Sequence, residues 1–169
     1  MQEIKDTQPK KGFTEFIGIF PEIELPVSLT EEARHLFSLK NKPIPDELID
    51  SFILPHDDEP VDEFTEFMAC FRIPGTGAFH ALVYWRAGLL NYQFHLITFD
   101  KKGEFIDKRV IAGTYSDGET VTQSIATIGD NLKIIIASGQ SAVSEDLFEA
   151  ATSTTYILEI LLDGGIRNA

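Results

Sequence analysis

The sequence predicts a mainly β protein of the α+β class, in which an antiparallel meander of about seven to eight strands follows two short N-terminal α-helices. Apolar residues recur at helical spacing in the segment before the meander, and the period changes to two from Phe67 onward. No helix-length segment lies between residues 78 and 137, so parallel pairing is not expected. Closure into a barrel or a roll would remove the exposed edges of such a sheet.

The N-terminal part of the chain is expected to be a flexible tail over residues 1–12, ahead of a single globular domain over 13–169. A chain of 169 residues fits one domain, and its 43% hydrophobic share is sufficient to build a core. Phenylalanine and glycine alternate with isoleucine over residues 16–20, which predicts a short strand ending at Pro21.

Two helices are predicted between this strand and the meander. Ser28 and Glu31 have the spacing of a capping box, and Thr30 is an alternative N-cap for the first helix. The second helix begins near Pro45, which suits a first helical turn, and ends at Pro55. The apolar faces comprise Leu29, Ala33, Leu36 and Phe37 in the first helix, and Leu48, Ile49, Phe52 and Ile53 in the second.

The meander is expected to occupy residues 67–166. Turn sequences such as DKKG, SDG and GDN contain the residues that adopt turn conformations most readily. The longest irregular stretch, 139–155, carries the apolar pair Leu147 and Phe148, which is expected to pack on the core or to cover a barrel mouth. The strands are predicted at 67–73, 78–86, 89–99, 104–113, 119–128, 131–137 and 154–162, with a short strand at Ile166.

The hairpin over residues 78–99 provides the most specific local prediction. With Ala87 and Gly88 as a two-residue turn, His80 would face His95 on the neighbouring strand. This register separates polar from apolar side chains, whereas a slip by one residue would mix them. A longer loop with a bulge at Gly88 would change the pairing. The polar face comprises the ligand-binding candidates His80, Tyr84, Arg86, Asn91, Gln93 and His95.

This polar face has three interpretations. It could line a concave surface that binds a small ligand, or it could be an ordinary solvated sheet face. The two histidines could also form half of a zinc site, but such a site needs three or four ligands and no further ligand can be placed. We therefore predict no metal and no cofactor. The aromatic-rich region around Trp85 and Tyr92 is a second candidate location for a small ligand.

The net charge of −13 is concentrated ahead of the sheet. Residues 21–66 hold thirteen acidic and three basic residues, a net charge of −10, whereas residues 67–169 hold eleven acidic and eight basic residues, a net charge of −3. Such a surface repels nucleic acids and anionic membranes, but it suits a basic protein partner or simply solubility. The candidate contact residues end the helical acidic segment 28–66 and are Asp57, Asp58, Glu59, Asp62, Glu63 and Glu66.

Most of these carboxylates lie in the stretch LPHDDEPVDEF, residues 54–64. Its prolines favour an extended path at Leu54 and Glu59, so neighbouring carboxylates would point apart instead of converging on a cation. The stretch also lacks the glycine that folds a calcium-binding loop around its ion. A solvated linker and an acidic contact surface remain the favoured interpretations, ahead of a metal site.

Motifs of catalysis are absent from the sequence. There is no nucleophile elbow, phosphate-binding loop or dinucleotide fingerprint, so a non-enzymatic protein with no catalytic residues is expected. The single cysteine, Cys70, rules out an internal disulfide and is expected to be a buried, inert thiol. No apolar stretch has the length of a signal peptide or a membrane helix, which predicts a cytoplasmic location.

The leading functional prediction is therefore a non-enzymatic interaction protein whose acidic face engages a basic protein partner. One alternative is a β-barrel or roll that binds a small ligand on the 78–99 hairpin. Another is a structural protein without a ligand. The sequence leaves the oligomeric state open.

Overall fold

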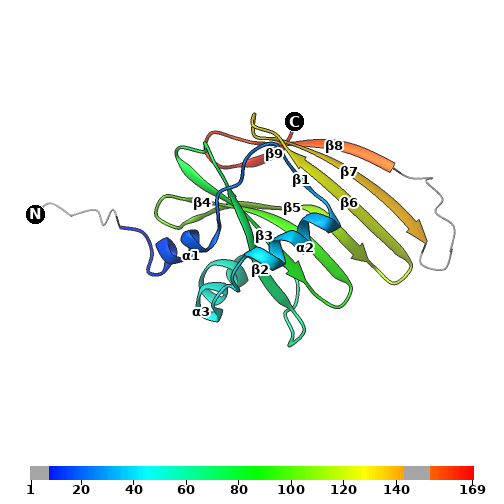
Figure 1. Ribbon diagram of the computed structural model, residues 1–169, viewed down its shortest axis with the longest axis horizontal. Coiled ribbons are helices and arrows are strands. Elements are labelled where there is room, and N and C mark those ends of the chain that lie inside the picture. The colour runs from blue at the N-terminus through cyan, green and yellow to red at the C-terminus, as the bar shows by residue number, and fades with distance from the viewer. Residues whose placement is uncertain (1–7, 143–152) are drawn as a thin grey trace, which may run out of the picture.

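The computed structural model describes residues 8–142 and 153–169, and an antiparallel sheet dominates them (Figure 1). The strands of these residues are β1 Val27–Leu29, β2 Glu66–Ile73, β3 Phe79–Ala87, β4 Asn91–Asp100, β5 Phe105–Ser116, β6 Thr120–Ile128, β7 Lys133–Ala142, β8 Ser153–Ile160 and β9 Ile166–Asn168. Strands β2 to β9 pair in chain order, and β1 pairs with β6. The predicted class, a mainly antiparallel β protein with short helices, is confirmed.

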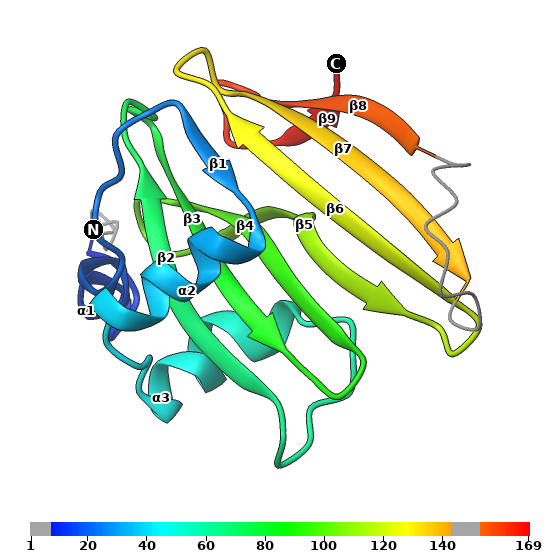
Figure 2. The same ribbon diagram turned by 45° about the vertical axis from the view of Figure 1, so that its right-hand side comes forward.

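The sheet is curved but does not close into a barrel. Strand β5 pairs with β4 over most of its length, but it pairs with β6 only through residues 113–116. Beyond this point the two strands diverge, and β1 pairs with residues 126–128 of β6 instead. Two register shifts between β4 and β5 mark bulges, which increase local twist. The result is an open cup whose two halves meet at β5 (Figure 2).

An inner hydrophobic core lies on the concave side of this cup. It joins buried residues from every strand of the described chain, because inward side chains alternate along each strand. Phe37 of the helix α2 (Glu31–Lys40) packs on this core, with its ring centroid 5.5 Å from that of Phe71. Among the largest buried members are Phe71, Phe79, Phe94, Leu29 and Leu96.

A second core lies on the outer face of β2, β3 and β4. Two helical segments cover this face, namely α1 (Phe13–Ile19) and α3 (Asp46–Leu48), which continues into a π turn (Ile49–Ile53) and a 3-10 turn (Leu54–His56). The buried members of this core are Phe13, Phe16, Ile17, Phe20, Ile44, Leu48, Phe52, Ile53, Ala69, Leu82, Tyr84, Ile97 and Phe99.

The predicted strand at residues 16–20 is wrong, because residues 16–19 belong to α1 and Phe20 is its C-cap. Phe13, Phe16, Ile17 and Phe20 are all buried, and they fall at the i, i+3, i+4 and i+7 positions of one helical face. In a run where nearly every residue is apolar, strand and helix periods cannot be distinguished locally. The helix forms because it directs the side chains of Phe13, Phe16, Ile17 and Phe20 onto the outer face of the sheet, which a strand would not do.

Thr30, the alternative N-cap considered from the sequence, is the N-cap of helix α2. The Thr30 hydroxyl accepts a hydrogen bond from the Ala33 amide at 3.3 Å, whereas Ser28 lies in β1. No residue of α2 is fully buried, and Leu39 is 71% exposed. The helix therefore lies across the mouth of the cup rather than inside it, as Figure 2 shows. None of the helices in the described ranges combines the length and hydropathy needed to cross a bilayer.

The loop between β3 and β4 is longer than the predicted two-residue turn. Ala87 pairs with Tyr92, and the Gly88 amide donates to the Asn91 carbonyl at 2.8 Å. His80 consequently faces Phe99, four residues beyond His95. The predicted register is wrong, but a shift by an even number of residues preserves which side chains share a face.

Two further predictions fall partly outside the described residues. Strand β7 extends to Ala142 and β8 begins at Ser153, so both described ends of the predicted irregular stretch 139–155 lie in strands. Leu147 and Phe148 lie outside the described residues. Of the predicted N-terminal tail, residues 1–7 also lie outside them, while the Lys10 amide donates to the Lys102 carbonyl at 2.8 Å.

Candidate functional site

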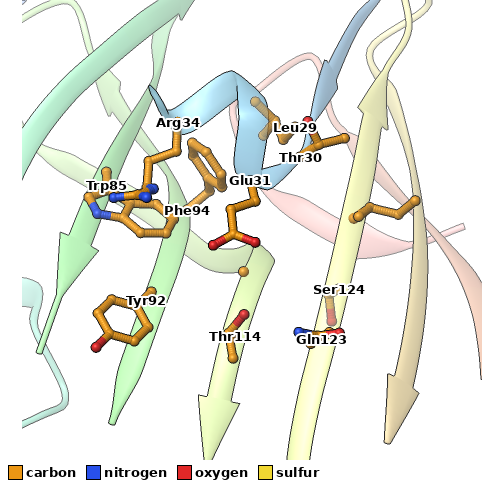
Figure 3. A pocket seen from close by; sticks show the side chains of 12 residues that line it. Leu29, Thr30, Glu31, Arg34, Trp85, Tyr92, Phe94, Thr114, Gln123 and Ser124 are labelled. Atoms are coloured by element: carbon orange, nitrogen blue, oxygen red, sulfur yellow. The ribbon is translucent and has the colours of Figure 1, made fainter. Parts of the chain in front are cut away.

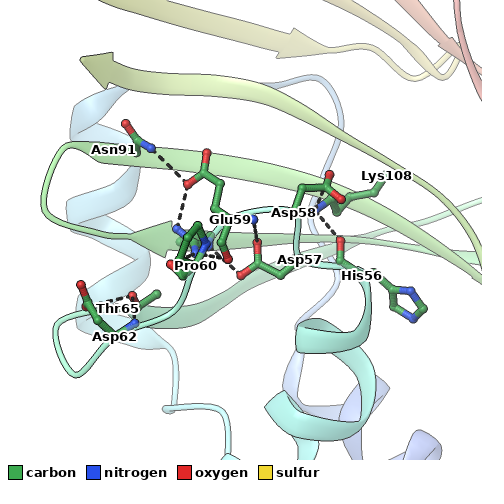
Figure 4. A network of polar contacts seen from close by, with 10 residues as sticks. His56, Asp57, Asp58, Glu59, Pro60, Asp62, Thr65, Asn91 and Lys108 are labelled. Atoms are coloured by element: carbon green, nitrogen blue, oxygen red, sulfur yellow. Dashed lines mark hydrogen bonds and ion pairs between the residues drawn. The ribbon is translucent and has the colours of Figure 1, made fainter. Parts of the chain in front are cut away.

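The predicted polar face and the predicted acidic surface meet each other on the outer side of the sheet. Arg86 on β3 is only 3% exposed. Its Nε donates to Asp57 Oδ2 at 2.9 Å, and its Nη1 donates to Glu59 Oε2 at 3.1 Å. Asn91 Nδ2 also donates to Glu59 Oε2 at 3.1 Å (Figure 4). The segment after the 3-10 turn is thus fastened to the hairpin and is not a free linker.

Arg86 is satisfied further by backbone groups of the same segment. Its Nη2 donates to the carbonyls of Glu59 and Pro60, at 3.4 and 3.2 Å. The Asp57 side chain is 3% exposed, whereas that of Glu59 is 36% exposed. Two of the six predicted partner-binding carboxylates therefore neutralise a buried arginine within the molecule.

The remaining predicted contact residues, Asp58, Asp62, Glu63 and Glu66, are exposed. The Asp58 side chain is 93% exposed, although its carboxylate lies 3.7 Å from Lys108 Nζ. Lys108 Nζ also donates to the His56 carbonyl at 2.6 Å, as Figure 4 shows. Asp62 Oδ1 accepts from the Phe64 amide at 2.8 Å, which orders the turn locally.

Three other predicted ligand-binding residues, Tyr84, His95 and His80, make ring contacts on the outer side of the sheet. The rings of Tyr84 and His95 stack with centroids 5.0 Å apart, and both residues are buried. Burial, supported by the charges of Lys108 and Arg86, lowers the pKa of His95 to about 3. His80 lies against the Phe13 ring, and burial lowers its pKa as well. Gln93 is half-buried in the ladder opposite Arg86.

A cavity of about 510 Å³ opens on the opposite, concave side of the sheet (Figure 3). It lies where β5 and β6 diverge and is covered by the first turn of α2. Gly113 on β5 has a φ of 123°, and a Cβ there would overlap the Tyr92 carbonyl oxygen, so only glycine permits this path. The cavity is lined by Leu29, Thr30, Glu31, Arg34, Trp85, Tyr92, Phe94, Gly113, Thr114, Gln123, Ser124 and Ile125.

One wall of the cavity is aromatic. The Trp85 and Tyr92 rings are nearly parallel, at 15°, with centroids 6.4 Å apart. Phe94 packs edge-on against Trp85 at 4.8 Å and holds its ring in place. Trp85 is 8% exposed, whereas Tyr92 is 45% exposed. The wall is therefore a fixed apolar surface with one ring accessible to a ligand.

Helix α2 supplies two charged side chains to the cavity. The guanidinium carbon of Arg34 lies 5.4 Å from the Trp85 ring centroid, a cation–π distance. Figure 3 shows the Glu31 carboxylate directed from α2 toward Thr114, with the Arg34 guanidinium beside the Trp85 ring. The opposite wall carries hydroxyl and amide groups from Gln123 and Ser124. The cavity thus combines an aromatic surface with separated positive, negative and neutral polar groups.

The sequence indicated only part of this site. The region around Trp85 and Tyr92 was a predicted location for a ligand, and the structure places both rings in the cavity. Glu31, Arg34 and Gln123 were missed, because residues from distant segments meet only once the sheet curls. No local pattern distinguishes Arg34 from any other exposed residue of an amphipathic helix.

The fold and the cavity together define an open, cupped antiparallel sheet with a site of ligand size on its concave side. Comparison of the chain with protein-family models, curated proteins and solved structures finds no match. Among the described residues, no three His, Cys, Asp or Glu side chains gather closely enough to hold a metal ion. The chemistry of the cavity is therefore the basis for a functional proposal.

Proposed function

We propose that this protein is a non-enzymatic binding protein that holds a small amphipathic ligand in the concave-face cavity. The observation that carries the proposal is the cavity itself, about 510 Å³ in volume. Ligand pockets typically span about 300–1,000 Å³ and combine apolar walls with a few oriented polar groups. This proposal keeps the small-ligand alternative from the sequence and, of its two candidate locations, favours the region of Trp85 and Tyr92 over the outer polar face.

The lining supports binding rather than chemical conversion. Its aromatic wall would gain about 25 cal/mol for each Å² of apolar surface removed from water. Phe94 already holds the Trp85 ring, which reduces the entropy lost on binding. The one carboxylate of the lining, Glu31, belongs to an exposed residue and lacks the desolvated setting typical of a general base.

The test uses Trp85, the sole tryptophan of the sequence, as a fluorescent reporter within the cavity. A chemically diverse set of small molecules is screened by Trp85 fluorescence and by thermal unfolding. A ligand at about 100 times its Kd stabilises the folded state by about 2.7 kcal/mol, which raises the unfolding temperature by a few degrees.

A cavity-filling variant locates the binding. Thr114→Phe places a ring inside the cavity and should abolish the response. The control is Thr155→Phe on β8, an exposed position opposite Ala137 that lies outside the cavity lining. The proposal is refuted if no compound binds, or if Thr114→Phe binds as tightly as the control.

We propose as a second function that the exposed carboxylates contact a basic protein partner. The supporting observation is that Asp62 and Glu63 stay exposed although Asp57 is buried. Binding of a basic protein should fall steeply with added salt and with the double substitution Asp62→Lys/Glu63→Lys. The matched control is Glu119→Lys/Asp130→Lys in exposed turns of the sheet. Equal loss in both variants would contradict a specific acidic surface.

A further inference from the structure

We propose that the cavity recognises a zwitterion with a flat apolar group, the chemical class of an aromatic α-amino acid. The carboxylate of the ligand would bind Arg34, its ammonium group would bind Glu31, and its ring would lie on Tyr92. This inference rests on the proposed function of the cavity and names the ligand class.

Arg34 is the exception among the five arginines of the chain. The other four each lie within ion-pair distance of a carboxylate, although the chain has 27 acidic residues to offer. Within the described ranges no carboxylate or carbonyl engages the Arg34 guanidinium, which lies half-buried over Trp85. Its N–H donors, five in a guanidinium, therefore remain available to a ligand carboxylate. The four ion pairs are Arg72–Glu22, Arg86–Asp57, Arg109–Asp107 and Arg167–Glu159.

Glu31 provides the complementary charge. It lies three residues before Arg34 on the same helix, a spacing at which opposite charges commonly pair. Here the described residues show no ion pair between the two head groups, and Figure 3 shows both directed from α2 into the cavity. A zwitterion can bridge such a pair because it presents a carboxylate and an ammonium group side by side.

The charge of the whole protein favours a neutral ligand. At a net charge of −13, the surrounding field repels anions during association. A simple cation would instead meet the Arg34 guanidinium inside the cavity. A zwitterion carries no net charge, so it escapes the general repulsion and still satisfies both side chains.

The aromatic wall defines the rest of the ligand. The Trp85 ring is already covered by Arg34 and Phe94, whereas the Tyr92 ring is 45% exposed beside it. A ring placed on Tyr92 would lie next to the Arg34 guanidinium, in offset contact with an aromatic surface. The Arg34 guanidinium lies 5.4 Å from the Trp85 ring centroid, and the Tyr92 centroid lies 6.4 Å from that of Trp85, so a ligand on Tyr92 needs its ring close to its charged head group.

The experiment compares phenylalanine with three analogues by isothermal titration calorimetry and by Trp85 fluorescence. Phenylalaninamide lacks the carboxylate, N-acetylphenylalanine lacks the ammonium group, and alanine lacks the ring. Phenylalanine should bind at least about tenfold more tightly than each analogue, the size expected for losing one charge-assisted hydrogen bond or the buried ring.

Two substitutions connect each preference to its side chain. In Arg34→Gln, phenylalanine and phenylalaninamide should bind with equal affinity. In Glu31→Gln, phenylalanine and N-acetylphenylalanine should bind with equal affinity. The controls are Lys40→Gln and Glu32→Gln, which make the same charge changes on exposed positions of the same helix outside the cavity lining. Both controls should retain the preferences of the unaltered protein.

The outcomes separate this inference from the proposed function. If other compounds bind in the cavity and Thr114→Phe abolishes their binding, but phenylalanine shows no preference over its analogues, the zwitterion inference is overturned alone. Preferences that persist in Arg34→Gln and Glu31→Gln would overturn it as well. If no compound binds at all, the proposed function fails together with the inference.

Discussion

Removal of Arg86 should destabilise the protein more than any substitution at an exposed ion pair. Arg86→Met keeps the apolar stem of the side chain but leaves the Asp57 carboxylate without its cation. That carboxylate is 3% exposed, so water cannot replace the guanidinium. Glu59, at 36% exposure, can recover part of its hydration.

The expected cost follows from the burial of this pair. Breaking a buried ion pair by removing one partner costs about 3–5 kcal/mol. Domains of this size are stable by about 5–15 kcal/mol, so Arg86→Met removes a large fraction of the total. The double variant Arg86→Met/Asp57→Asn should lose less than the sum of the two single variants, because no unpaired charge stays buried.

Urea unfolding followed by Trp85 fluorescence measures these differences. The control is Arg167→Met, which breaks the ion pair between Arg167 and Glu159. The Arg167 side chain is 62% exposed and the Glu159 side chain is 29% exposed. Exposed pairs contribute about 0–1 kcal/mol, so this variant should stay close to the unaltered protein. Equal free energies of unfolding for Arg86→Met and Arg167→Met would refute the role assigned to the buried pair.

Three further predictions concern single positions. Burial lowers the pKa of His95 to about 3, so the unfolded chain takes up a proton at this residue before the folded protein does. The free energy of unfolding should therefore be highest above about pH 6.5 and fall toward pH 3, by up to about 1.4 kcal/mol per pH unit. His95→Phe should reduce this slope in urea titrations. Gly113→Ala should prevent normal folding, measured by thermal unfolding, whereas Gly118→Ala, with a φ of 95° but no atoms near its Cβ, should cost about 1–2 kcal/mol. Cys70 is fully buried with a raised pKa, so a thiol reagent should modify it only after urea unfolds the chain; rapid reaction in the native state would contradict its burial.

The antiparallel class and the approximate strand limits followed from the sequence, because alternation and turn residues act over a few neighbours. The two faces of the β3–β4 hairpin were also predictable, since the alternation of side chains survives any even shift in register. The residue pairs across this hairpin were not predictable from the sequence. The predicted pairing of His80 with His95 failed because four residues, not two, separate the last paired residues Ala87 and Tyr92, and this spacing depends on packing beyond the turn.

The helical conformation of residues 13–19 was decided by the sheet that it covers. Its short sequence supports either period, and an isolated helix of this length would not be stable in water. The acidic segment shows the same dependence. Its sequence predicted exposed carboxylates, but the positions of Asp57 and Glu59 beside Arg86 arose from folding the segment across the hairpin.

The sequence by itself determined the mainly β class, the succession of strands from residue 66 onward and the concentration of negative charge ahead of them. Only the tertiary structure decided which side of the sheet carries a cavity. Trp85 and Arg34 are separated by about fifty residues of chain yet lie 5.4 Å apart. Local patterns cannot report such contacts, because they arise from the curvature of the whole sheet and from the divergence of β5 and β6.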